Sequence, residues 1–154
     1  MENAVEAIMS RKIEAIDVSE SAEDAARKMR DKKISSLVVL DKTKKGGEPL
    51  GIVTERDLVY KICAHGSSGK DVRVQEIMSS PIATIDPRST VEGAADLMLS
   101  NKVRHLLVVN VDKTPIGIVA PTDLNKYLRS NIDMDEVNAR ILKAVLDGEE
   151  MGEP

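Results

Sequence analysis

Aromatic residues are almost absent from this sequence, whose 154 residues include two tyrosines, no tryptophan and no phenylalanine. A hydrophobic core must therefore be built from Ile, Val, Leu, Ala and Met, and a hydrophobic content of 42% is sufficient for one. Proteins that bind single-stranded nucleic acid stack its bases on exposed aromatic rings. The scarcity of such rings argues against that function.

Residues that form disulfides or bind metals are equally scarce, with one cysteine and two histidines. The lone Cys63 excludes an internal disulfide, which fits a reducing compartment and predicts a cytoplasmic location. Cys63 and His65 lie close together in the sequence, but a zinc site needs further ligands. We therefore expect no metal site.

Long apolar segments are also missing. No apolar run approaches the roughly 18 residues that a membrane-spanning helix needs, and the N-terminus lacks the pattern of a signal peptide. The formal net charge is −4, and residues 133–154 carry most of the acidic excess. This balance disfavours binding to nucleic acid and to anionic membranes. We expect neither as a partner.

What the sequence does contain is an internal repeat. Ile8-Met9-Ser10 recurs 69 positions later as Ile77-Met78-Ser79, and Gly51-Ile52-Val53 recurs 66 positions later as Gly117-Ile118-Val119. The difference in offset falls in the Lys- and Gly-rich segment 42–48. Loops tolerate such changes in length, so this segment is expected to be a turn between strands.

Each copy predicts the element order β-α-β-β-α. Ser21 and Thr90 are good N-cap residues for the first helix of each copy. Apolar residues then recur at helical spacing, which indicates one buried stripe per helix: Ala22, Ala25, Ala26 and Met29, then Val91, Ala94, Ala95 and Met98. The expected strands are 13–18, 37–40, 50–53, 82–85, 106–109 and 116–119, and the closing helices are 55–62 and 122–128.

One copy buries too little surface to be stable alone, whereas two copies can pack sheet against sheet about a pseudo-twofold axis. We therefore predict an α/β (α+β) fold of two β-α-β-β-α repeats, residues 1–64 and 75–130, joined by a linker at 65–74. Residues 131–154 are predicted to form a C-terminal helix, from Asn131 to Leu146, followed by an acidic tail.

This pattern resembles the CBS domain (the cystathionine-β-synthase-type repeat), and two copies in tandem resemble a Bateman module. The resemblance rests on the ordered set Ile-Met-Ser, a capped helix with Ala-Ala and Met, an apolar strand and Gly-Ile-Val-Thr-x-x-Asp, and it covers residues 8 to about 128. It implies a regulatory module that binds AMP, ADP, ATP or S-adenosylmethionine in clefts between the repeats. Such a module acts by conformational change on a partner protein or within a homodimer.

The resemblance implies a first cleft that takes residues from both repeats: Thr54, Arg56, Asp57, Ile82, Ala83, Arg104 and His105. The Asp57 carboxylate has two acceptor oxygens, which suit the hydroxyls of a ribose. Arg104 and His105 offer donors to phosphate oxygens. Ile82 and Ala83 are expected to form an apolar floor beneath adenine.

A second and weaker cleft is expected at the equivalent positions: Lys12, Ile13, Ser35, Ser36, Thr122 and Asp123. Ala120 stands where the first cleft has Thr54, and Ser35-Ser36 replaces Arg104-His105, which leaves no fixed cation. We therefore expect asymmetry, with a phosphorylated adenosine in the first cleft. The second is expected to be empty, weak or suited to a less charged compound.

These residues also have purely structural interpretations. Thr54 and Asp57 have the spacing of a capping box, which needs no ligand, and Arg104 could be a solvated surface cation. Leu107 stands where family members often have proline. The alternative function is a ligand-free dimerisation or interaction scaffold. No nucleophile, base and orienting group occur together, so we expect no enzymatic activity.

Overall fold

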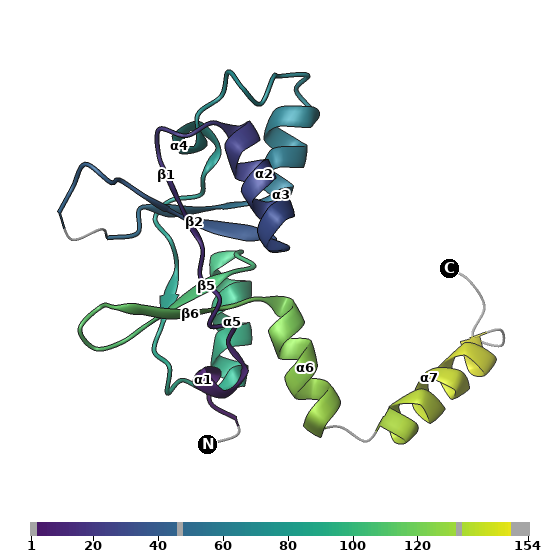
Figure 1. The fold of residues 1–154 in the computed structure, drawn as a ribbon. Coiled ribbons are helices and arrows are strands. Elements are labelled where there is room, and N and C mark those ends of the chain that lie inside the picture. Colours follow the sequence, from purple (N-terminus) through teal and green to yellow (C-terminus); the bar gives the residue numbers. More distant parts are fainter. Residues whose placement is uncertain (1–2, 46–47, 132–133, 149–154) are drawn as a thin grey trace.

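In a computed structural model, the chain forms two three-stranded sheets with helices packed against them, and the last helix extends away from the sheets (Figure 1). The structure describes residues 3–45, 48–131 and 134–148. One sheet has the order β1-β2-β3 (Ala15–Asp17, Ser36–Leu40, Gly51–Thr54), and the other has the order β4-β5-β6 (Thr84–Ile85, Leu106–Val109, Pro115–Val119). In each sheet the first pair of strands is parallel and the second antiparallel. The predicted α/β fold of two like repeats is confirmed.

The first helices of the repeats are α2 (Ala22–Lys32) and α5 (Val91–Asn101), and both begin at the predicted caps. The Ser21 hydroxyl accepts from the backbone N–H of Asp24 at 3.0 Å, and the Thr90 hydroxyl accepts from that of Gly93 at 3.0 Å. The predicted stripe is buried except at its third position. Ala26 is exposed because it faces a cavity rather than the core.

The closing helices differ in detail from the prediction. In the first repeat α3 (Glu55–Leu58) continues as a π-helical turn, η1 (Val59–Cys63). In the second, α6 (Pro121–Asn131) is longer than predicted and includes Asn131. The C-terminal helix α7 therefore begins at Met134 rather than Asn131, and it ends at Gly148. The acidic tail beyond Gly148 lies outside the described residues.

The structure contains two short helices that the sequence analysis did not predict. Each packs against the core of the other repeat. In α1 (Val5–Ile8), Val5 is fully buried in the core of the second repeat. In α4 (Val74–Ile77), both terminal residues are buried in the core of the first. Each hydrophobic core thus contains residues from both of the sequence repeats, 1–64 and 75–130. In each repeat, the sheet and its first helix leave an apolar surface uncovered. The N-terminal segment of the other repeat, which contains α1 or α4, covers this surface.

A third buried cluster joins the two sheets. Val38 of β2 and Leu107 of β5 occupy equivalent positions, and both are buried together with Ile118 of β6. Ile13, Leu40, Ile82 and Val109 pack around them. The repeats therefore meet sheet to sheet, as predicted, and residues at the ends of these strands lie beside the other repeat.

Candidate functional site

Two cavities lie where the repeats meet. The smaller, of about 410 Å³, is termed the Asp57 cavity, and the larger, of about 660 Å³, is termed the Asp123 cavity. The Asp57 cavity is lined by every residue that the sequence analysis placed in the first cleft: Thr54, Arg56, Asp57, Ile82, Ala83, Arg104 and His105. The fold thus brings together side chains that lie up to about fifty positions apart in the sequence.

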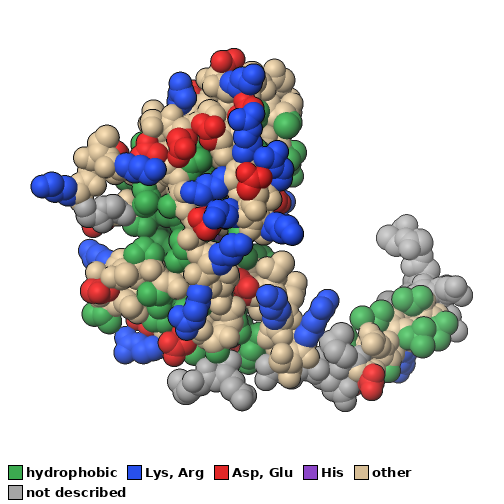
Figure 2. Space-filling view, in the orientation of Figure 1, with side chains coloured by type: hydrophobic (Ala, Val, Ile, Leu, Met, Phe, Trp, Pro, Cys, Tyr) green, Lys and Arg blue, Asp and Glu red, His purple; other side chains and the backbone are tan. Residues whose placement is uncertain are grey.

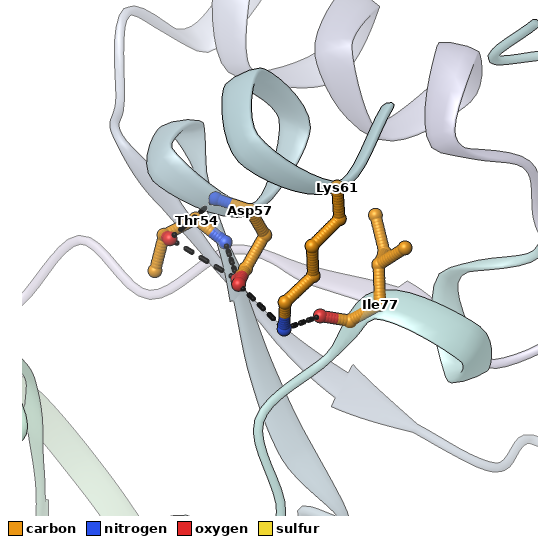
Figure 3. Close-up of polar contacts among 4 residues, drawn as sticks. All are labelled: Thr54, Asp57, Lys61 and Ile77. Carbon is orange, nitrogen blue, oxygen red and sulfur yellow. Dashed lines mark hydrogen bonds and ion pairs between the residues drawn. The ribbon is translucent and has the colours of Figure 1, made fainter. Parts of the chain in front are cut away.

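Asp57 lies at the start of α3, where β3 ends, and its side chain is buried (Figure 3). Its Oδ2 accepts hydrogen bonds from the Thr54 backbone N–H at 2.9 Å and the Thr54 hydroxyl at 3.1 Å. The Thr54 hydroxyl in turn accepts from the backbone N–H of Asp57 at 3.3 Å. The structural interpretation as a capping box is therefore correct, and it fixes the carboxylate at the wall of the cavity.

Lys61 is a partner of Asp57 that the sequence analysis missed. Its Nζ lies 3.1 Å from Asp57 Oδ1 and donates to the Ile77 carbonyl oxygen at 2.8 Å (Figure 3). The Asp-Lys spacing of four residues on a predicted helix was the signal available. A carboxylate oxygen has two acceptor sites, so Oδ1, with one contact from Lys61, can still accept one hydrogen bond from a ligand.

The cationic side of the same cavity comes from the second repeat and from α3. Arg104 is exposed and His105 is half-buried just before β5. Arg56, which also lines the cavity, lies over the Tyr60 ring, 5.2 Å from its centroid. The apolar side consists of Ile82 and Ala83, both half-buried. A carboxylate, cations and an apolar floor therefore line one cavity.

The Asp123 cavity contains five of the six residues predicted for the second cleft: Lys12, Ser35, Ser36, Thr122 and Asp123. Ile13 is not among its lining residues and packs instead against the cluster between the sheets. Burial raises the pKa of Asp123, although the Ala120 backbone N–H, which donates to its Oδ2 at 2.8 Å, opposes this shift.

The premise that this second cleft has no fixed cation is wrong. Besides Lys12, its lining includes Arg30 and Lys33 from the end of α2 and Lys126 from α6. The Lys12 ammonium is held by the Lys32 carbonyl oxygen at 2.7 Å. These cations come from elements other than the one that supplies Arg104 and His105 in the first cleft, so the equivalent positions Ser35 and Ser36 do not reveal them. Without this basis, we no longer expect the Asp123 cavity to prefer a less charged compound.

Four residues line both cavities: Ser35, Glu55, His105 and Thr122. The two cavities are therefore neighbours with a common wall. Burial lowers the pKa of His105, the adjacent Arg104 lowers it further, and Asp57 opposes the shift. His105 is thus mainly neutral at pH 7, where it has one N–H to donate and one nitrogen that accepts.

We expect His105 to reduce stability as the solution becomes acidic. Because its pKa in the folded protein lies below the ordinary value of 6.5, the unfolded chain binds the proton first. The free energy of unfolding should therefore fall as the pH decreases through 6.5. Urea denaturation at pH 8 and pH 5.5 measures the loss, which should be smaller in His105→Gln. His65→Gln, at an exposed position, is the control, and equal losses in all three proteins would contradict the assignment.

No group of three or more His, Cys, Asp or Glu side chains within 3–45, 48–131 and 134–148 could hold a metal ion. In that same part of the chain, no helix has both the length and the apolar character needed to cross a membrane.

The sequence matches the family model of the CBS domain twice, over residues 5–64 and 74–130. The chain therefore belongs to the CBS-domain family, and its two copies make it a tandem CBS protein. CBS-domain pairs are regulatory modules.

Relatives and solved structures agree with this assignment. An uncharacterized protein of Methanopyrus kandleri is 36% identical over 75% of this chain and 59% of its own length. The mitochondrial CBS domain-containing protein CBSX3 of Arabidopsis thaliana is 37% identical over 66% of this chain and 49% of its own length. The chain thus spans about half the length of these relatives. The structure of a hexameric CBS-CP12 protein from bloom-forming cyanobacteria matches with a TM-score of 0.74 and 30% identity, over 97% of this chain and 88% of that one.

Proposed function

We propose that this chain is a sensor of an adenosine-containing nucleotide, namely AMP, ADP, ATP or S-adenosylmethionine, which binds in the Asp57 cavity. The observation that carries the proposal is that every residue expected in the first cleft lines this one cavity, with contributions from both repeats. Its volume of about 410 Å³ lies within the range of about 300–1,000 Å³ that is usual for small-molecule sites.

Three groups of lining residues contact the three parts of the ligand, namely the ribose, the adenine and the phosphates. The free acceptor site on Asp57 Oδ1 takes a ribose hydroxyl, and the half-buried Ile82 and Ala83 lie against the adenine. Arg104 donates to the phosphates, and His105 adds a second donor. Because Asp57 and Arg104 belong to different repeats, a bound nucleotide favours one relative placement of the two. A ligand can shift that placement only by its difference in affinity between them.

The output of the sensor is a protein–protein contact, within a homodimer or with a regulated partner. Figure 2 shows apolar side chains gathered on α7, and Ile141, Leu142, Val145 and Leu146 are each more than half exposed. This surface also favours the second candidate function, a dimerisation scaffold whose cavities bind no ligand. Catalysis and a nucleic-acid partner are not part of the proposal, and a cytoplasmic location stays a prediction.

Isothermal titration of the purified chain with AMP, ADP, ATP and S-adenosylmethionine tests the proposal. We expect a dissociation constant near micromolar for at least one ligand, which corresponds to about −8 kcal/mol. The recovered nucleotide should be unchanged, since turnover would indicate an enzyme. No heat with any of the four ligands, together with a stable dimer in sedimentation, would support the scaffold instead.

A further inference from the structure

Three lysines have a backbone conformation that normally belongs to glycine. Among the described residues, positive φ angles at non-glycine positions occur at Lys33 (56°), Lys102 (55°) and Lys113 (66°). Side chains of L-residues crowd the backbone in this left-handed region, whereas glycine enters it freely. Lysine at such a position therefore reduces stability relative to glycine, and strained positions of this kind cluster at functional sites.

Two of the three lysines are equivalent and differ from the third in their surroundings. Lys33 ends α2 and Lys102 ends α5, and each donates its backbone N–H to carbonyls of the last helical turn. Lys33 lines the Asp123 cavity, and Lys102 lines the Asp57 cavity. Lys113, in the turn between β5 and β6, lines neither.

A structural role at the helix end does not account for both lysines. A cation near a helix C-terminus interacts favourably with the helix dipole. The last turn of α5 has no other basic residue, so this role could explain Lys102, but α2 already has Arg30 and Lys32 in its last turn, so it does not explain Lys33. Within 3–45, 48–131 and 134–148, neither the Lys33 nor the Lys102 ammonium has an ion-pair partner. Each therefore brings an unpaired positive charge to the wall of a cavity.

We propose that Lys33 and Lys102 are equivalent phosphate-binding residues, one in each cavity. This inference rests on the proposed function, because the phosphates are those of the nucleotide. In the Asp123 cavity, Lys33 joins Lys12, Arg30 and Lys126. In the Asp57 cavity, Lys102 joins Arg56 and Arg104. Both cavities therefore select a phosphorylated ligand over the uncharged nucleoside.

The variants Lys33→Gly and Lys102→Gly test this inference because stability and binding should change in opposite senses. Glycine adopts the left-handed conformation without strain, so the melting temperature of each variant should rise by about 2–4 °C. Each should also weaken one ATP-binding event by about tenfold, as expected for the loss of a charged hydrogen bond. Affinity for adenosine should stay within about twofold of the original, because adenosine has no phosphate. Lys33→Arg and Lys102→Arg, which keep the charge, should retain ATP affinity.

Lys113→Gly is the matched control, since it removes a lysine at a similar φ angle away from both cavities. It should be stabilised like the other two variants and bind ATP like the original chain. If the original binds ATP and all three glycine variants bind it equally well, the phosphate-binding role is wrong while the sensor function stands. If the original chain binds neither ATP nor adenosine, the sensor function itself is wrong, and the inference falls with it.

Discussion

Replacing Gly51 with alanine is expected to lower the free energy of unfolding by about 3 kcal/mol. A Cβ at this position would lie 2.4 Å from the Ser79 carbonyl oxygen and 3.3 Å from its carbonyl carbon. These are backbone atoms, and Ile52 holds them by hydrogen bonds in both directions, at 3.0 Å and 2.8 Å. The segment after α4 therefore cannot move aside without losing its pairing with β3. Urea denaturation followed by circular dichroism measures the effect.

Two further glycines provide controls for this prediction. A Cβ at Gly117, the equivalent position, would meet mainly the flexible Met9 side chain, with the Ser10 carbonyl oxygen at 3.0 Å, so Gly117→Ala should cost less. Gly93→Ala lies within α5, where alanine favours the helix by up to about 1 kcal/mol and offsets a 3.1 Å approach to the Thr90 hydroxyl. Wild-type stability in Gly51→Ala would contradict the packing of each N-terminal segment against the other repeat.

The second large effect is expected on ligand binding. Asp57→Asn should weaken nucleotide binding by about 10- to 100-fold, because a hydrogen bond to a charged acceptor contributes about 1.5–3 kcal/mol. The asparagine keeps one carbonyl oxygen, which can still accept from the Thr54 backbone N–H. It loses the charge that pairs with Lys61. Titration calorimetry gives the affinity, and thermal denaturation shows whether the variant is folded.

Asp123→Asn is the matched control for this experiment. Asp123 is as buried as Asp57, at 7% exposure, and also accepts from the backbone N–H three positions before it. It lines only the other cavity, so the affinity of the Asp57 cavity should stay unchanged. Equal nucleotide binding by Asp57→Asn and the original chain would mean that Asp57 has only its capping role.

Features that depend on local sequence were predictable. The caps at Ser21 and Thr90 follow from the residue type, since serine and threonine are favoured at the N-cap position of a helix, and the internal repeat gave the order of strands and helices. The residues of the Asp57 cavity followed from the family resemblance, which fixes which ends of the two repeats face each other. The exposure of Ala26 could not be read from helical spacing, because it depends on a cavity formed with the other repeat.

Features that depend on contacts between the repeats were missed. Nothing in the sequence of α1 or α4 indicates that Val5 completes the second core and Val74 the first. The cations of the Asp123 cavity were overlooked because Arg30 and Lys126 come from helices that meet only in the folded protein. The contact of Lys61 with the Ile77 carbonyl oxygen likewise joins segments on either side of the linker.

A crystal structure of the chain grown with ATP would show whether the nucleotide binds between the repeats at the Asp57 cavity. We expect the nucleotide between the two sheets, with a ribose hydroxyl on Asp57, adenine against Ile82 and phosphates beside Arg104. A nucleotide bound far from these residues, or repeats whose sheets face away from each other, would contradict it.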